Sequence, residues 1–364
     1  MSTIGLARKS AEAVGALYKY STLAPRRRPG DSILLEVNKA VNFRTVRELL
    51  IFFESAKHSV YLAAHLGRWS LAAARSLRWH TNTTLLWSGF TSPQAHVVCT
   101  DNPNRSFDKL RGCQKLICLR YDYGPRLRLP PRHFAMPLVM HPQIYVQYRG
   151  HERLESYRSA PRKIRMAFAG HLDKGYQSSS VREQFGRLTR LEVLDFLKNE
   201  GLIRVVSSAR ELRAALNGPY RHEFLVVTHP LRIDQGEWLQ FLSQVDFLLC
   251  PPGILFPWCH NAVEAMAVGT IPLTNYPDCF FPSLVHGENC VAFSSYGDLQ
   301  RGVMEVLNMG EDVVTGMRKN VIEYYDRHLS LARAAARILD SPWETVCLHI
   351  EDEREESVPA MVGH

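Results

Sequence analysis

The sequence predicts an α/β protein of two domains, each built on a parallel β-sheet. Its 364 residues exceed what one compact core usually holds, so two domains are the default expectation. Short apolar runs alternate with longer helical patterns, which is typical of βα units. Prolines between residues 130 and 142 interrupt this alternation, which restarts at Ile164. We therefore expect domains at residues 1–150 and 151–340, with the boundary between about Met136 and Lys163, and a C-terminal tail at 341–364.

In the first half, short apolar runs predict strands and longer amphipathic stretches predict helices. The stretch at residues 69–77 is rich in alanine and leucine, which are strong helix formers. In chain order we expect a strand at Ile33–Val37, helices at Thr45–Phe53 and Trp69–Leu77, and strands at Thr84–Trp87, Ala95–Cys99 and Lys115–Leu119.

The second half repeats the pattern. Leucine and phenylalanine recur at helical spacing over Val181–Asn199, and Gly201 ends that helix. Further helices are expected at Trp238–Val245, Asn261–Val268, Leu299–Leu307 and Val313–Leu339. Strands are expected at Ile164–Ala169, Ile203–Val206, Phe224–Thr228, Asp246–Cys250 and Thr270–Leu273, and the acidic stretch Glu351–Glu356 is expected to fray.

The composition, 46% apolar and 22% charged, is that of an ordinary globular chain. No apolar run approaches the roughly 20 residues needed to span a bilayer, and the first thirty residues lack the pattern of a signal peptide. A cytoplasmic protein is the simplest expectation. The eight cysteines show no paired CxxC spacing, which argues against a zinc site and a disulfide framework.

The net charge of +8 is unevenly distributed, because residues 1–160 hold 24 Lys and Arg against 10 Asp and Glu. One interpretation is a basic surface with no special partner. The other is an anionic partner for the first half, such as a membrane surface or an acidic acceptor. The cluster Arg26–Arg28, behind an amphipathic pattern at residues 4–18, would suit peripheral membrane contact. Nucleic acid is not expected, because no recognised motif accompanies the basic half.

The most informative stretch is the strand–loop–helix step at residues 246–268. In a doubly wound sheet, ligands bind outside the carboxyl ends of the strands, and a helix N-terminus there suits a pyrophosphate. Gly253 would allow close approach to the backbone, and Glu264 could accept hydrogen bonds from a ribose diol. The alternative is structural, since Asn261 is an ordinary N-cap residue and Glu264, three positions later, would complete a capping box.

The segment PPGILFPWCHNAVEAMAVGTIPLTNYPDCFFPSLVHGENCVAF at residues 251–293 resembles the donor-binding core of GT-B glycosyltransferases. Within that group it is similar to the exostosin-like and group-one families. The resemblance implies two Rossmann-like domains facing across a cleft, with Glu264 binding the nucleotide ribose. It also implies that Gly253, His260 and Asn261 reach the donor phosphates or sugar. The stretch AFAGHLDKGYQS resembles the first strand and loop of the same domain, which adds Gly170 and Lys174.

The resemblance covers about residues 161–340, whereas the first half matches only in general pattern. Many retaining members carry a second acid eight positions before the glutamate, where this chain has Phe256, so retention or inversion stays open. Arg182 and Asn289 are further donor-side candidates, although Asn289 could simply form a turn, and His229 could line the cleft or cap a loop. Asp101 is the candidate catalytic base, with an ordinary turn as its alternative, and Glu36, His65 and Arg68 are weaker candidates.

These patterns predict transfer of a sugar from a nucleotide-diphosphate donor to a hydroxyl acceptor in the interdomain cleft. No DxD-like acidic pair stands at a strand end, so neither a metal nor another cofactor is expected. The helix at 313–339 would cross back to the first domain. Two alternatives stay open: an epimerase or phosphorylase with the same nucleotide or phosphate site, and a noncatalytic protein that binds a nucleotide-sugar or an anionic polymer.

Overall fold

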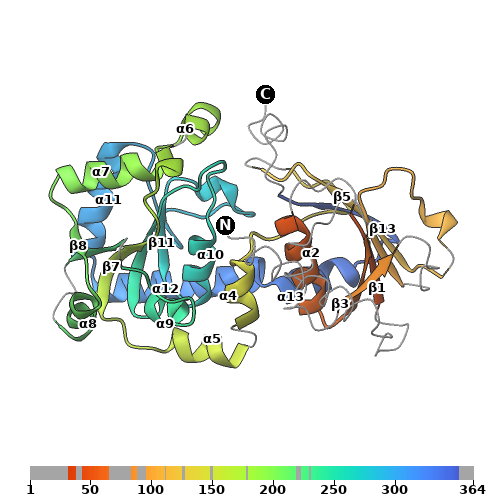
Figure 1. Cartoon of the computed structure of the whole chain (residues 1–364), viewed down its shortest axis with the longest axis horizontal. Coiled ribbons are helices and arrows are strands. Elements are labelled where there is room, and N and C mark those ends of the chain that lie inside the picture. The colour runs from red at the N-terminus through yellow and green to blue at the C-terminus, as the bar shows by residue number, and fades with distance from the viewer. Residues whose placement is uncertain are drawn as a thin grey trace, which may run out of the picture. The chain divides into compact units, whose positions relative to one another are not determined.

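The computed structural model describes residues 32–37, 43–64, 83–87, 96–110, 112–124, 128–147, 151–177, 179–218, 223–228 and 231–351. The chain divides into two compact units (Figure 1). Of the described residues, unit 1 contains 32–137 together with 331–351, and unit 2 contains 138–330. No helix within these described ranges is long and apolar enough to cross a membrane.

Unit 1 is built on a seven-stranded sheet in the order β3-β2-β1-β4-β5-β13-β6, and all its paired strands are parallel. Strands such as β1 are buried along their whole length, as expected when helices cover both faces of a parallel sheet. Helix α2 packs on β2 and on α13. The elements of unit 1 are β1 (Ser32–Glu36), α2 (Phe43–Ser55), β2 (Ser59–Ala64), β3 (Thr83–Trp87), β4 (Val97–Thr100), η2 (Phe107–Lys109), β5 (Lys115–Arg120), β6 (His133–Ala135), α13 (Leu331–Leu339) and β13 (Thr345–His349).

The end of the chain differs from the expected tail. Strand β13 lies between β5 and β6, with Val346 and Leu348 buried, so residues 345–349 complete the sheet of unit 1. Lys115 fixes the preceding helix by donating from Nζ to the carbonyls of Ile338 (3.0 Å) and Ser341 (2.6 Å) at the end of α13. The first unit ends at residue 137, within the boundary expected between Met136 and Lys163, and it resumes at residue 331, so α13 and β13 belong to unit 1 instead of forming part of the second domain and a separate tail. A pairing between strands more than 200 residues apart leaves no local sequence pattern.

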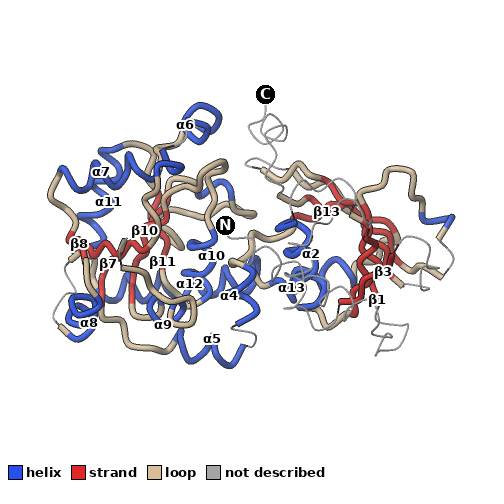
Figure 2. Tube along the Cα trace, viewed as in Figure 1, coloured by secondary structure: helices blue, strands red, loops and turns tan. Residues whose placement is uncertain are grey.

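Unit 2 is built on a six-stranded parallel sheet in the order β12-β11-β10-β7-β9-β8. Helices lie on both sides of its strands (Figure 2). Its strands are β7 (Ile164–Ala169), β8 (Arg204–Val206), β9 (Phe224–Val227), β10 (Val245–Cys250), β11 (Ile271–Thr274) and β12 (Val291–Ala292). Its helices are α4 (Pro142–Gln147), α5 (His151–Arg158), η3 (Lys174–Gln177), α6 (Ser179–Phe185), α7 (Arg190–Asn199), α8 (Ala209–Asn217), α9 (Trp238–Leu242), α10 (His260–Ala267), η5 (Pro277–Cys279), α11 (Tyr296–Asn308), α12 (Glu311–Tyr324) and η6 (Tyr325–Leu329). The predicted α/β class with two parallel sheets is confirmed.

The strand order of unit 2 reverses direction between two neighbouring strands. From β7 the chain proceeds to β8 and β9 on one side, whereas from β10 it proceeds to β11 and β12 on the other. The crossover connections therefore leave β7 and β10 in opposite directions. Such a topological switch point opens a crevice at the carboxyl ends of the two strands, which is where doubly wound sheets bind their ligands.

Two predicted helices are each divided in the structure. The stretch 181–199 forms α6 and α7, because Gly186 adopts a left-handed conformation (φ +63°) and Thr189 then caps a new helix in a capping box with Glu192. The stretch 313–339 forms α12, a short π-helix and α13, with an extended residue at Ser330. Because of the first division, a second helix begins at Arg190, so a basic side chain stands in its first turn.

A buried ion-pair network fixes the two central strands of unit 2. Asp246 of β10 is fully buried and accepts a hydrogen bond from Arg165 of β7 at 3.1 Å, and Arg318 of α12 binds its other oxygen. Arg165 also binds Glu311 at 2.7 Å. The network ties α12 to β7 and β10, the strands between which the crevice opens.

Candidate functional site

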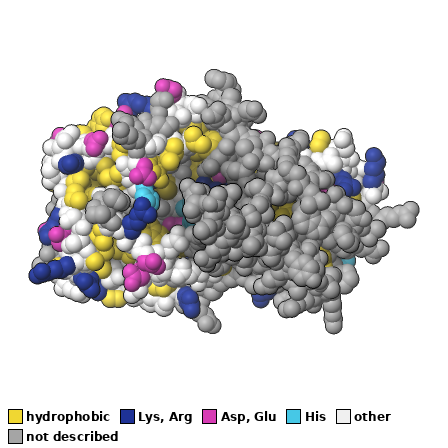
Figure 3. Space-filling model, viewed as in Figure 1, with side chains coloured by type: hydrophobic (Ala, Val, Ile, Leu, Met, Phe, Trp, Pro, Cys, Tyr) yellow, Lys and Arg dark blue, Asp and Glu magenta, His cyan; other side chains and the backbone are white. Residues whose placement is uncertain are grey.

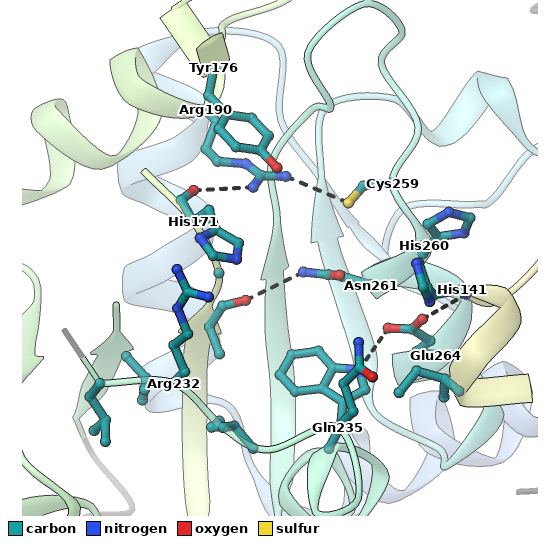
Figure 4. A pocket seen from close by; sticks show the side chains of 17 residues that line it. His141, His171, Tyr176, Arg190, Arg232, Gln235, Cys259, His260, Asn261 and Glu264 are labelled. Carbon is teal, nitrogen blue, oxygen red and sulfur yellow. Dashed lines mark hydrogen bonds between the residues drawn. The ribbon is translucent and has the colours of Figure 1, made fainter. Parts of the chain in front are cut away.

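A pocket of about 470 Å³ opens in unit 2 at the carboxyl ends of β7 and β9, beside the start of α10, the helix that follows β10 (Figure 4). Its wall comes from the ends of β7 and β9, the start of α7, the residues before α9, the start of α10 and the segment around α4. The pocket thus occupies the switch point that the strand order defines. On the visible face of unit 2, acidic and basic side chains are interspersed (Figure 3).

Arg190, the first residue of α7, supplies the cationic end of the pocket. It is only 3% exposed, and its guanidinium stacks on the ring of Tyr176 with 3.7 Å to the ring centroid. Its Nη1 donates to the carbonyl of His171 at 3.2 Å and its Nη2 to the Sγ of Cys259 at 3.5 Å, while its buried Nε has no hydrogen-bond partner in the part of the chain that the structure describes. Among the described residues no carboxylate pairs with it. A buried cation without a counter-ion is costly, which indicates that an anionic ligand completes this end.

The N-terminus of α10 lies beside Arg190. Its N-cap is Cys259, whose side chain makes no capping hydrogen bond, so the positive end of the helix dipole is not offset by a capping side chain. Asn261 donates from Nδ2 to the carbonyl of Ala169 at 3.4 Å and joins the end of β7 to this helix. The arrangement suits a phosphate group, which accepts hydrogen bonds from backbone N–H groups at helix starts.

Glu264 supplies the acidic end of the pocket and is 2% exposed. Its Oε1 accepts from the backbone N–H of His141 at 2.9 Å, and its Oε2 accepts from the indole Nε1 of Trp238 at 2.6 Å (Figure 4). Burial raises the pKa of this carboxyl, and these two donors act against that rise. Each carboxylate oxygen has a second lone pair, so the group can still receive two hydroxyl donors from a ligand.

The capping-box alternative for Glu264 is wrong. The helix begins at His260, which makes Asn261 its second residue rather than its N-cap, and the carboxylate binds residues 141 and 238. His260 lines the pocket and its Nδ1 lies 2.6 Å from the carbonyl of Val139. Because a carbonyl only accepts, Nδ1 carries the proton of that hydrogen bond. Two side chains of α10, Glu264 and His260, thus bind the segment 139–141.

Four of the predicted donor residues line the pocket: Gly170, His260, Asn261 and Glu264. Three others do not occur among its described lining residues. A Cβ on Gly253 would lie 2.8 Å from the carbonyl oxygen of Phe256, so the close packing of its own loop requires a glycine at this position.

The other two also have structural partners. Arg182 is half-exposed and pairs with Glu192 at 2.8 Å. Asn289 forms the turn that was its alternative, since its Oδ1 accepts from the N–H of Val285 at 2.8 Å. Lys174 lies in η3, and its side chain is outside the described residues, as is the whole of His229.

The acceptor-side candidates lie in unit 1. Asp101 follows β4, is 6% exposed and accepts a hydrogen bond from the hydroxyl of Tyr121 at 2.8 Å. The turn after it is formed by Asn102, whose side chain accepts from the N–H of Asn104. Glu36 ends β1 and is held by two hydrogen bonds from Arg105. His65, Arg68 and the N-terminal basic cluster lie outside the described residues.

The sequence interpretation missed Arg190, Tyr176 and Trp238. A signal for Arg190 existed, because a basic residue in the first turn of a helix opposes the helix dipole and favours an anionic partner. The single helix expected over 181–199 starts beside Arg182, so this signal applied to Arg182 and not to Arg190. The pairing of Trp238 with Glu264 had no signal in the sequence. Among the described residues no group of three His, Cys, Asp or Glu side chains is placed to hold a metal ion.

Two parallel α/β units, one with a ligand pocket at its switch point, define a protein of the doubly wound class. No family model matches the chain, and no curated protein matches it. The solved structures similar to it include a glycosyltransferase from Rickettsia africae, with a TM-score of 0.47 at 11% identity over 86% of this chain and 98% of that one. Another is HepE from Anabaena in complex with UDP and glucose, with a TM-score of 0.41 at 9% identity over 85% and 98%. A third is an α-glucosyltransferase in complex with UDP and DNA, with a TM-score of 0.40 at 11% identity over 82% and 95%.

Proposed function

We propose that this chain is a glycosyltransferase that binds a nucleotide-diphosphate sugar in the pocket of unit 2 and transfers the sugar to a hydroxyl acceptor. The main observation behind the proposal is that the pocket of unit 2 has a cationic end and an acidic end. A buried arginine that pairs with no carboxylate of the described residues lies at one end, and a buried carboxylate held by two N–H donors lies at the other. A nucleoside diphosphate offers the matching groups, an anionic diphosphate next to a ribose diol.

The sequence of the second domain supports the same proposal. The segment 251–293 resembles the donor-binding core of exostosin-like and group-one glycosyltransferases, in which a glutamate in the place of Glu264 binds the ribose. In this structure that glutamate lies on the pocket wall, together with His260, Asn261 and Gly170. The diphosphate is proposed to bind Arg190 and the start of α10.

The same groups would promote the reaction. When the bond from the sugar to the diphosphate breaks, negative charge grows on the leaving diphosphate. Arg190 and the N-terminus of α10 would stabilise this charge more strongly in the transition state than in the bound donor, which lowers the barrier. Since these groups supply positive charge, we propose that transfer needs no divalent metal, and EDTA should leave the rate unchanged.

A thermal-shift screen with UDP, GDP, CMP and dTDP sugars tests donor binding, because a ligand that binds only the folded state raises Tm. Arg190→Gln should weaken the affinity for the best donor about 10- to 100-fold, since a hydrogen bond to a charged group contributes about 1.5–3 kcal/mol. Arg182→Gln is the matched control, because that arginine is half-exposed and pairs with Glu192. Equal donor affinity in both variants would contradict the phosphate assignment.

Product analysis distinguishes transfer from the alternatives. Incubation of the best donor with an acceptor panel should give an elongated acceptor and free nucleoside diphosphate. Accumulation of an epimerised donor or a sugar phosphate would instead indicate an epimerase or a phosphorylase. Binding without transfer or donor hydrolysis across the panel would identify a noncatalytic binding protein.

A further inference from the structure

Cys259 is a partly exposed thiol in the wall of the pocket of unit 2. It is the N-cap residue of α10, and its side chain makes no capping hydrogen bond. Its Sγ instead accepts a hydrogen bond from the Nη2 of Arg190 at 3.5 Å (Figure 4). The sulfur therefore lies between the positive end of a helix dipole and a guanidinium, which is the electropositive, partly exposed setting in which reactive cysteines occur.

Arg190 independently indicates that an anion binds beside this sulfur. The side chain is 3% exposed, and within the described residues its Nε has no hydrogen-bond partner and no carboxylate pairs with its guanidinium. The ring of Tyr176 covers one face of the guanidinium, so a ligand reaches the cation through its N–H groups. A neutral thiol is a weak acceptor for such a group. An oxygen bonded to the sulfur is a stronger acceptor, so oxidation of Cys259 would improve its pairing with Arg190.

Three other cysteines lie in different surroundings. Cys113 is partly exposed and donates from Sγ to the carbonyl of Lys115 at 3.1 Å. Burial raises the pKa of Cys113 and that of Cys118, so less of each thiol is in the nucleophilic thiolate form at neutral pH. Cys250 is fully buried at the end of β10, where a reagent in solution does not reach it. Of these four thiols, Cys259 is the one that combines exposure with a hydrogen bond from a cation.

We propose that Cys259 is a redox modification site, at which a hydroperoxide oxidises the thiol to a sulfenic acid and thereby excludes the donor diphosphate from Arg190. The added oxygen lies beside the guanidinium and accepts the hydrogen bond that a phosphate oxygen otherwise receives. Oxidation and donor binding therefore compete for the same cation, and oxidation switches the pocket off. The donor diphosphate is the anion assigned to Arg190, so this proposal rests on the proposed function.

The reaction is a two-electron oxidation of the sulfur by the hydroperoxide. The thiolate sulfur attacks the hydroxyl oxygen of the peroxide, an S–O bond forms and the O–O bond breaks. The electron pair of the O–O bond leaves with the second oxygen, which takes up the proton that the thiol released. Hydrogen peroxide thus gives water, and an organic hydroperoxide gives an alcohol. A thiol reductant reverses the change, because it condenses with the sulfenic acid to a disulfide that a second thiol reduces.

Trapping with dimedone, which reacts with sulfenic acids, tests the site. The full chain is treated with hydrogen peroxide and dimedone, with and without inorganic pyrophosphate, and peptide mass spectrometry locates the labelled cysteines. Cys259 should be labelled faster than the partly exposed cysteines of unit 1, which are Cys113, Cys118 and Cys347. Pyrophosphate at about ten times its Kd should slow the labelling of Cys259 about tenfold, since about one site in ten then stays empty. The labelling of Cys113 should not change.

The second measurement is the affinity for pyrophosphate after brief oxidation without dimedone. The Kd should rise at least about tenfold, which is the effect of losing one hydrogen bond to a charged group, and dithiothreitol should restore it. Each variant is compared with its own untreated sample. Cys259→Ser should keep its Kd after the same treatment. Cys113→Ser is the matched control and should lose affinity as the wild type does.

The outcomes separate this modification site from the proposed function. Labelling of Cys259 no faster than that of Cys113 overturns the site and leaves the glycosyltransferase proposal standing. Labelling that pyrophosphate does not slow also overturns it, as does an oxidised chain that binds pyrophosphate with an unchanged Kd. If pyrophosphate slows the labelling but no nucleotide-sugar binds or is transferred, the competition at Arg190 stands and the proposed function fails.

Discussion

Replacement of Trp238 by phenylalanine tests the acidic end of the pocket most directly. The change keeps an aromatic ring and removes the indole N–H that donates to Glu264 at 2.6 Å. The carboxylate keeps its bond from His141, so it loses one of two hydrogen bonds from the protein. A hydrogen bond to a charged group contributes about 1.5–3 kcal/mol, and the lower limit corresponds to about a tenfold change in an equilibrium constant. We therefore expect the Kd for the preferred nucleoside diphosphate to rise about tenfold or more.

The same substitution should change the pH dependence of binding. A protonated carboxyl has lost a lone pair that a ribose hydroxyl needs, so donor affinity falls as pH drops through the pKa of Glu264. Burial already raises that pKa, and the indole donor acts against the rise. Without the indole N–H the pKa rises further, so affinity should be lost at a higher pH in Trp238→Phe than in the wild type.

Isothermal titration calorimetry across a pH series measures both effects. A second comparison uses a 2′-deoxy nucleotide, which lacks one hydroxyl donor: the preference for the ribonucleotide should be smaller in Trp238→Phe. Trp343→Phe is the control, because that tryptophan lies in unit 1 and packs against Phe134. An unchanged Kd together with an unchanged midpoint in Trp238→Phe would refute the assigned role of the Trp238–Glu264 pair.

Three further predictions concern stability, each read as Tm and as the free energy of unfolding from denaturant titration. Gly253→Ala should lower the free energy of unfolding by about 1–3 kcal/mol, because the new Cβ would lie 2.8 Å from a backbone carbonyl oxygen. Gly316→Ala is the control: the space around Gly316 in α12 is open, so this change should leave the free energy of unfolding unchanged or raise it by up to about 1 kcal/mol. Asp246→Asn should cost about 3–5 kcal/mol, since it removes the fully buried acid that pairs with the buried Arg165 and with the partly buried Arg318; a loss below about 1 kcal/mol would show that the network is dispensable. Lys115→Met should cost about 1–3 kcal/mol by removing the cation that caps α13, and an unchanged Tm would contradict that role.

The sequence predicted the elements with strong periodicity and the acid of the pocket, but not its cation. Most strands of both sheets and the helix that carries Glu264 follow from local apolar patterns, whereas β2, β6, β12 and β13 were not predicted. Arg190 was missed because leucine spacing continues across the break at Gly186, and nothing in that spacing shows where a second helix starts. The requirement of its own loop for Gly253 could not be recognised, because a glycine needed by its loop looks the same in sequence as one that makes room for a phosphate.

Contacts between distant segments account for the rest. Glu264 meets Trp238 and His141, which lie 26 and 123 residues away, and local spacing carries no information about either pair. The hydrogen bonds that join His349 to Asp122 and to His133 likewise form only because β13 is inserted beside β5. The sequence therefore identifies the residue types that a site can use, whereas the strand order decides which of them meet.

The position of β13 has a consequence for biosynthesis. The strand stands between β5 and β6, so the sheet of unit 1 lacks an inner member until the ribosome has made residue 349. All the strands of unit 2 are complete by residue 292. Unit 2, although later in the chain, can thus reach its native topology before unit 1. Until residues 345–349 are made, the edges of β5 and β6 stay unpaired, and this interval is when the nascent chain would most need a chaperone.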